Sequence, residues 1–100
     1  MVTYTVAFTE QFQAFLDRLK DPIASRAIKT RIVRIEAGLF CDVKSVGGKV
    51  MEARVDVGPG YRLYYTISGH EMVVLLVGGD KRRQRADIEA AKALAAGLGK

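Results

Sequence analysis

The stretch VMEARVDVGPGYRLYYTI, residues 50–67, carries the pattern that decides the fold. Two runs in which apolar and polar residues alternate, 50–57 and 61–67, flank the sequence GPG at 58–60. Alternation of this kind is typical of strands with one buried and one solvated face, and a Gly-Pro-Gly break joins such strands. The segment therefore predicts a β-hairpin with a tight turn at 58–60.

Pairing Val57 with Tyr61 sorts the hairpin side chains into two faces, because side chains alternate along a strand. One face is apolar and is predicted to be core: Met51, Ala53, Val55, Val57, Tyr61, Leu63, Tyr65 and Ile67. The other is polar and is predicted to be solvated: Glu52, Arg54, Asp56, Arg62, Tyr64 and Thr66. This register sets three pairs opposite each other: Asp56–Arg62, Arg54–Tyr64 and Glu52–Thr66. A slip of one residue at the turn would mix the two sets, which argues against it.

Upstream of the hairpin, the sequence predicts a strand at 2–8 and two helices. Thr9 fits the N-cap of a helix over 10–19. Its apolar face is formed by Phe12, Phe15, Leu16 and Leu19. A second helix begins at Pro22 after the N-cap Asp21, runs to about residue 37 and ends at Gly38. Its apolar stripe is formed by Ile28, Ile32, Ile35 and Leu39.

The remaining segments complete an α+β domain. Short strands are predicted at 43–46 and 71–77, and a final helix at 81–96. The apolar side of that helix carries Ile88, Ala91, Leu94 and Ala95. MVVLLV at 72–77 does not alternate, which is typical of an interior strand covered on both faces. The order β-α-α-β-β-β-β-α predicts one domain over residues 1–100, with a central antiparallel meander packed on a helical hairpin.

The amino-acid composition limits which classes of protein this sequence can belong to. About half of the 100 residues are apolar (49%), which allows a core without a metal or disulfide. The N-terminus has no basic segment followed by an apolar one, and no apolar run is long enough to span a membrane. A single cysteine, Cys41, cannot form an internal disulfide. We therefore expect a cytoplasmic protein without membrane association.

The sequence offers no pattern for a metal or cofactor. One histidine, His70, and one cysteine give no ligand spacing, so neither is expected to bind metal. His70 is predicted to lie in a hairpin turn, and Cys41 in a loop. The net charge of +5 by itself fits a generic basic surface; a functional positive charge would favour polyanionic partners, either phosphate backbones or an acidic protein.

The polar face of the hairpin is the candidate site. Arg54 and Arg62, a strand apart, could clamp a phosphate, and Tyr64 could donate a proton or stack on a base. Lys81 follows the last strand and could approach the same face. Three further cations lie beyond it: Arg82, Arg83 and Arg85. The alternative is an ordinary solvated strand surface with cross-strand charge pairs such as Asp56–Arg62.

A second basic surface is predicted on the second helix. It carries Arg26, Lys29 and Arg34, together with Arg31. Such a face is commonly only solvated, and if it is functional it would bind RNA backbone or an acidic segment of a partner protein.

Three segments resemble addiction module killer proteins, the HigB-like branch of the RelE/ParE superfamily of type II toxins. They are FQAFLDRLKDPIASRAIKTRIVRIEAGLF at 12–40, CDVKSVGGKVMEARVDVGPGYRLYY at 41–65 and VVLLVGGDKRRQRADIEAAKAL at 73–94. The combination of GPGYR-x-Y with a following LL-x-GGDK-x-x-Q is specific to this resemblance, whereas each piece alone is common. The resemblance extends over nearly the whole chain.

The resemblance implies a RelE-like fold and a monomeric toxin neutralised by an antitoxin, typically a helix-turn-helix protein encoded by the adjacent gene. It implies metal-independent cleavage of mRNA on the ribosome, by attack of a 2′-hydroxyl on the adjacent phosphate. Arg54, Arg62 and Lys81 match the basic motif residues, and Tyr64 stands as their aromatic partner. No histidine lies near the closing helix, so the general base is open between Lys81 and Tyr64.

Two alternatives remain open at the level of the sequence. ParE-like members share the fold but poison DNA gyrase and have no nuclease role, and the arginine face would then be structural or would face the antitoxin. A decayed toxin would bind only its antitoxin and operator.

Overall fold

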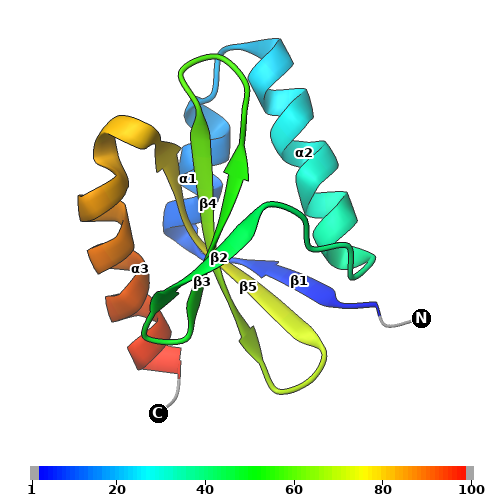
Figure 1. Ribbon diagram of the computed structural model, residues 1–100, viewed down its shortest axis with the longest axis vertical. Coiled ribbons are helices and arrows are strands. Elements are labelled where there is room, and N and C mark those ends of the chain that lie inside the picture. Colours follow the sequence, from blue (N-terminus) through cyan, green and yellow to red (C-terminus); the bar gives the residue numbers. More distant parts are fainter. Residues whose placement is uncertain (1–2, 99–100) are drawn as a thin grey trace.

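The computed structural model describes residues 3–98, in which a twisted five-stranded sheet carries helices on both faces (Figure 1). The elements in chain order are β1 (Thr5–Phe8), α1 (Glu10–Arg18), α2 (Pro22–Glu36), β2 (Val43–Gly47), β3 (Val50–Val55), β4 (Tyr61–Ser68), β5 (Met72–Asp80), the short 3-10 helix η1 (Lys81–Arg83) and α3 (Gln84–Leu98). The predicted α+β class and element order are confirmed, with η1 as an added turn before α3. Val2, included in the predicted first strand, lies outside the described residues.

The strands are arranged in the order β1-β5-β4-β3-β2. β2 to β5 form the predicted antiparallel meander, and β1 adds to β5 in parallel, with Thr5 beside Met72 and Phe8 beside Leu75. β5 therefore lies between two strands, and its residues 73–77 are all buried. This confirms the prediction that MVVLLV is an interior strand covered on both faces.

The predicted helix ends are confirmed by their caps. The Thr9 hydroxyl accepts a hydrogen bond from the Phe12 amide at 3.0 Å and donates to the Leu76 carbonyl at 2.6 Å, so the α1 cap also anchors α1 to β5. The Asp21 carboxylate accepts from the Ile23 amide at 2.9 Å in front of α2. Gly38, with φ of 80°, turns the chain away after α2.

The helical hairpin covers one face of the sheet, as predicted. Its core is formed by Phe12, Phe15, Ile28, Ile32 and Ile35 against Ala53, Val55, Leu63, Tyr65, Val73 and Leu75. Two predicted core residues do not belong to it: Leu39 is 59% exposed and Ile67 is 41% exposed. Leu39 is exposed because α2 ends at Glu36, three residues before it. Ile67 lies at the far end of β4.

The opposite face is not solvated throughout, which corrects the prediction from alternation. α3 packs on this face and encloses a second core of Val50, Tyr64, Val74, Leu76, Val77 and Ala91. Figure 1 shows α3 on one flank of the twisted sheet and α2 on the other. Glu52 and Tyr64, both predicted to be solvated, have no exposed surface. Only part of the polar face is therefore open to a ligand.

The register of the β3–β4 hairpin differs from the prediction by two residues. Val55, and not Val57, pairs with Tyr61, so that Arg54 lies opposite Arg62. The connection is a five-residue loop, 56–60, closed by a 2.9 Å hydrogen bond from the Gly60 amide to the Val57 carbonyl. Gly58 and Gly60 adopt φ of 55° and 86°, which a side chain would disfavour. A shift by an even number of residues leaves each side chain on its predicted face.

The predicted cross-strand pairs are wrong as a result of this shift. Asp56 lies in the loop and not opposite Arg62, and Glu52 lies opposite Tyr64 and not opposite Thr66. The ordinary charge pair Asp56–Arg62, the basis for interpreting this face as a simple strand surface, does not form.

Two consecutive glycines of β5 let helices approach both faces of the sheet at one point. A Cβ atom on Gly78 would overlap the Phe15 ring of α1, and a Cβ atom on Gly79 would overlap the Asp87 carboxylate of α3. Because successive strand residues point to opposite faces, Gly78 makes room for α1 on one face and Gly79 makes room for α3 on the other. The Gly-Gly pair therefore sets how closely α1 and α3 pack.

We expect Gly78→Ala to lower the free energy of unfolding by about 2 kcal/mol, because the added methyl group overpacks a rigid ring contact. Urea unfolding followed by circular dichroism measures the change. Gly97→Ala is the matched control: a Cβ there meets no atom within 4 Å, and the change should leave stability equal or raise it by up to about 1 kcal/mol. Equal stability of Gly78→Ala and the unsubstituted protein would contradict the proposed close approach.

Candidate functional site

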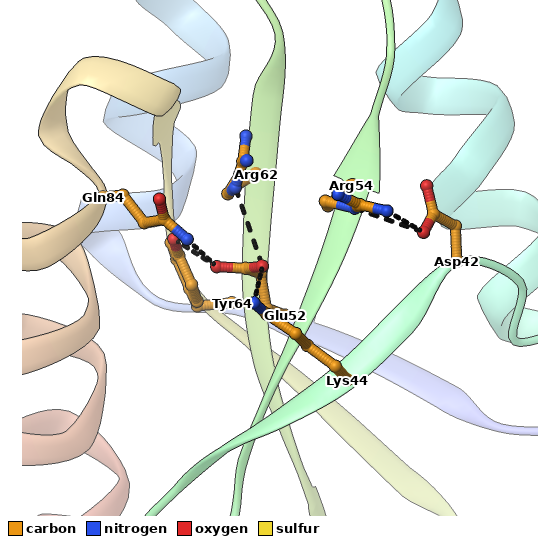
Figure 2. Close-up of polar contacts among 7 residues, drawn as sticks. All are labelled: Asp42, Lys44, Glu52, Arg54, Arg62, Tyr64 and Gln84. Carbon is orange, nitrogen blue, oxygen red and sulfur yellow. Dashed lines mark hydrogen bonds and ion pairs between the residues drawn. The ribbon is translucent and has the colours of Figure 1, made fainter.

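Two arginines face each other across the β3–β4 ladder. Arg54 and Arg62 are register partners, and both lie on the face of the sheet that α3 partly covers (Figure 2). Like charges placed directly opposite each other on a sheet destabilise it. Each arginine is accordingly paired with a carboxylate of its own.

Arg54 is held by Asp42, which precedes β2. The Arg54 guanidinium donates to one Asp42 oxygen from Nε at 3.2 Å and from Nη2 at 2.9 Å, and the Arg54 amide donates to the Asp42 carbonyl at 3.1 Å. Asp42 adopts a left-handed backbone conformation, φ 52°, to make this contact. The hydrogen bonds and the charge of Asp42 raise the pKa of Arg54. The Arg54 side chain stays half exposed and accessible to an anion.

Arg62 is paired with Glu52, whose carboxylate is fully buried. The Arg62 Nε lies 3.6 Å from Glu52 Oε1, and the Lys44 Nζ lies 3.8 Å from the same oxygen. The second oxygen, Oε2, accepts hydrogen bonds at 2.9 Å from the Tyr64 hydroxyl and at 2.9 Å from the Gln84 side chain. Glu52 therefore joins three strands and α3 (Figure 2).

Tyr64 is positioned by the sheet but does not reach the surface. Its ring is fully buried beneath α3, and its hydroxyl donates to Glu52. Burial, followed by the hydrogen bond to the Glu52 carboxylate, raises the pKa of Tyr64. Stacking on a base and shuttling a proton to a substrate both need an accessible ring or hydroxyl. The buried Tyr64 does not meet the requirement of either predicted role.

Lys81 begins η1 at the same end of the sheet as the β3–β4 loop. Its amide donates to the Gly60 carbonyl at 3.1 Å, and its aliphatic chain runs beside Gly60. The residue is exposed, so its ammonium group is accessible to a ligand. Lys81 therefore lies next to the loop that leads into Arg62.

The three arginines beyond Lys81 are exposed and flank Gln84, the α3 residue that contacts Glu52. Arg82 pairs with Asp80 at 3.1 Å, and the Arg83 Nε lies 4.0 Å from Asp87. The hydrogen bonds from Arg82 lower the pKa of Asp80. Arg85 is exposed as well. These arginines keep most of their surface open, which suits contact with a polyanion.

The basic residues of α2 are not brought to this site. Arg26, Lys29 and Arg34 are exposed on α2, which packs on the opposite face of the sheet from Arg54 and Arg62. The thickness of the sheet separates the two basic surfaces. The two predicted basic surfaces therefore lie on different faces of the sheet.

Other chemistry-bearing residues lie apart from the site. His70 is exposed in the β4–β5 turn, and Cys41 is exposed after α2. Among residues 3–98, no three His, Cys, Asp or Glu side chains gather as a metal site would require. In the same part of the chain, no helix combines the length and apolar character needed to cross a membrane.

The sequence patterns did not predict three residues of this site: Asp42, Glu52 and Gln84. Glu52 and Gln84 lie 32 positions apart, and Asp42 lies in a loop 12 positions before Arg54. The only signal in the sequence was that Glu52 shares a strand face with both arginines. The resulting arrangement, two arginines with their carboxylates and a nearby lysine, is suited to holding a phosphodiester.

Comparison with solved structures identifies the class of fold. An arginine-to-alanine double mutant of the Escherichia coli toxin RelE, in its free state, matches with a TM-score of 0.73 at 18% identity, over 92% of this chain and 98% of that one. The toxin–antitoxin complex RelBE2 of Mycobacterium tuberculosis matches with a TM-score of 0.63 at 26% identity, over 80% of this chain and 100% of that one. The fold is RelE-like, and the likeness to the RelBE2 complex supports placement in the RelE toxin superfamily.

Among curated sequences, an uncharacterised protein of Haemophilus influenzae is 42% identical over 98 residues, which is 98% of this chain and 99% of that protein. The chain belongs to the same family as this Haemophilus protein. No family model matches the chain.

Next to the site, Asp87 of α3 is a buried carboxylate with a testable pH dependence. Only 7% of it is exposed, and its Oδ2 has no hydrogen-bond partner among residues 3–98. Burial raises the pKa of Asp87 above its ordinary value of 3.8, and Arg83 offsets this in part. The folded protein therefore holds the Asp87 proton more tightly than the unfolded chain. The contribution of Asp87 to stability is present below the ordinary pKa and is lost as pH rises through the folded pKa.

We expect the stability of the unsubstituted protein, relative to Asp87→Asn, to fall as pH rises from about 3 to about 7. Urea unfolding at several pH values measures this difference. Glu89→Gln, which neutralises an exposed carboxylate of the same helix, controls for general loss of charge. A difference that stays constant over this range, or that changes in the opposite direction, would contradict the raised pKa.

Proposed function

We propose that the chain is the toxin of a type II toxin–antitoxin system and cleaves mRNA on the ribosome without a metal. The observation that carries the proposal is the pair of opposed arginines, Arg54 and Arg62, beside the exposed Lys81 on a RelE-like fold. The motifs shared with addiction module killer proteins support the HigB-like branch of the superfamily.

In the proposed mechanism, Arg54 and Arg62 bind the scissile phosphate and stabilise the charge that develops when the 2′-hydroxyl attacks it. The attack forms a 2′,3′-cyclic phosphate and breaks the bond to the 5′-oxygen, which leaves as a hydroxyl after taking a proton from solvent. Lys81 supplies further positive charge or acts as the general base. The sequence left the base open between Lys81 and Tyr64. Because Tyr64 is buried, Lys81 is the stronger candidate. Arg82, Arg83 and Arg85 extend the positive surface along the RNA backbone.

The cleavage test is induction of the chain in a bacterial host, with mapping of mRNA 5′ ends within minutes. New cuts in translated reading frames are expected, and Arg54→Ala and Arg62→Ala should each reduce cleavage on the order of 10²-fold, because each removes one preorganised charge. Lys20→Ala, which removes an exposed cation of the α1–α2 loop, should cleave normally.

Two results would reject the nuclease assignment, and a third would reject the role of Arg62 alone. Growth arrest with intact mRNA and gyrase-dependent DNA breaks would favour a gyrase poison. Absence of any growth phenotype would favour a decayed toxin. Undiminished cleavage by Arg62→Ala would remove Arg62 from the reaction.

We also propose that a cognate antitoxin, of the helix-turn-helix type and encoded by the adjacent gene, docks on α2. Two large apolar side chains of this helix, Ile23 and Val33, are 67% and 60% exposed. Arg26, Lys29 and Arg34 flank them. Exposed apolar residues bordered by cations suit an acidic amphipathic segment, and this favours a protein partner over RNA for these cations.

Co-expression with the product of the adjacent reading frame tests this docking surface. Val33→Glu places a negative charge on the proposed docking surface, so the variant should still arrest growth while rescue by the antitoxin is lost. Ser45→Glu, on the exposed β2 strand, is the control and should be rescued normally. Full rescue of Val33→Glu would show that the antitoxin binds elsewhere.

A further inference from the structure

Two buried polar atoms face each other at the centre of the site without forming a hydrogen bond. Glu52 Oε1 and Arg62 Nε are 3.6 Å apart, and neither has a hydrogen-bond partner among residues 3–98. Glu52 is fully buried, and the Arg62 side chain is 16% exposed. Leaving a buried atom of a charged group without a direct hydrogen bond is unfavourable, so the arrangement of these two atoms calls for an explanation beyond packing.

The Glu52 carboxylate is fixed by its other oxygen. Oε2 accepts two hydrogen bonds from neutral donors, the Tyr64 hydroxyl of β4 and the Gln84 amide of α3. Two donors on one oxygen, one from the sheet and one from the helix, fix the carboxylate plane. Oε1 is thereby left to face the cations Arg62 and Lys44.

This arrangement sets the direction of the Arg62 guanidinium. The planar guanidinium carries five N–H donors, and Glu52 Oε1 lies nearest to Nε, so the terminal nitrogens of Arg62 keep donors for another anion. Figure 2 shows these nitrogens pointing away from Glu52, on the face that Arg54 shares. Without the Glu52 charge behind it, Arg62 would be repelled by Arg54 opposite and would lose this orientation.

We propose that Glu52 and Gln84 are positioning residues that hold Arg62 with its terminal nitrogens directed toward a bound phosphate. The proposal rests on the function proposed above, in which Arg62 contacts the scissile phosphate. Gln84 is the first residue of α3, so the start of α3 is coupled to the guanidinium through one buried carboxylate.

The decisive variant is Glu52→Gln, which keeps the shape of the side chain and removes its charge. Arg62 keeps its own charge, so affinity for a short RNA oligonucleotide should change little. The cleavage rate on translating ribosomes should fall on the order of 10²-fold, because a misdirected guanidinium no longer meets the transition state. We expect the ¹H–¹⁵N signal of Arg62 Nε to be protected from exchange in the unsubstituted protein, because this atom is buried, and to exchange rapidly in the variant.

Two further variants separate positioning from general stability. Gln84→Ala keeps the Glu52 charge but removes one of its fixing hydrogen bonds, so a smaller loss of cleavage, about tenfold, is expected with the same change in the Nε signal. Lys44→Gln removes the other cation beside Glu52 Oε1 while leaving Arg62 paired. It should keep both the Nε signal and the cleavage rate.

The outcomes distinguish this inference from the proposed function. If Glu52→Gln is folded, keeps the protected Nε signal and cleaves normally, the positioning role is wrong while the nuclease function stands. If the unsubstituted protein does not cleave mRNA, the nuclease function fails, and the Nε signal of the variants still decides whether Glu52 orients Arg62. If Glu52→Gln does not fold, Gln84→Ala decides by the same two measurements.

Discussion

A carboxylate enclosed between the sheet and α3 is the constraint on which the candidate site depends. Glu52 has no exposed surface, and a buried charge is tolerated only when cations and hydrogen-bond donors surround it. Its partners come from β2, β4 and α3: Lys44, Arg62, Tyr64 and Gln84. Satisfying one carboxylate therefore requires these elements to meet in a single arrangement, and that arrangement leaves Arg54 and Arg62 side by side.

The close packing of α3 makes this enclosure possible. Gly79 has no side chain to keep Asp87 away, and Gly78 similarly admits Phe15 from the other side. The helix then covers Tyr64 and brings Gln84 over Glu52, while Arg54 stays half exposed beside Asp42. Backbone contacts at two adjacent glycines thus determine which part of the polar face is core and which part can meet a ligand.

Much of the fold could be predicted because the relevant signals are local. Thr9, Asp21 and Gly38 mark helix ends by direct contacts with neighbouring residues. The sheet face on which Arg54 and Arg62 lie follows from the alternation of side chains along a strand. An error of two residues in the predicted register does not change that face. That error arose because the loop at 56–60 takes five residues, with Val57 accepting a bond from Gly60, and not three.

The amino-acid sequence by itself determined the strands, the helices, the apolar face under the helical hairpin and the gathering of cations on the other face. These features depend on spacing along the chain, which the period of a strand or helix converts directly into direction. Only the tertiary structure decided that Tyr64 and Glu52 are buried, that Asp42 holds Arg54, and that the cations of α2 lie across the sheet from the arginines. Each of these depends on where a distant segment packs, and burial is a property of the assembled layers that no local pattern encodes.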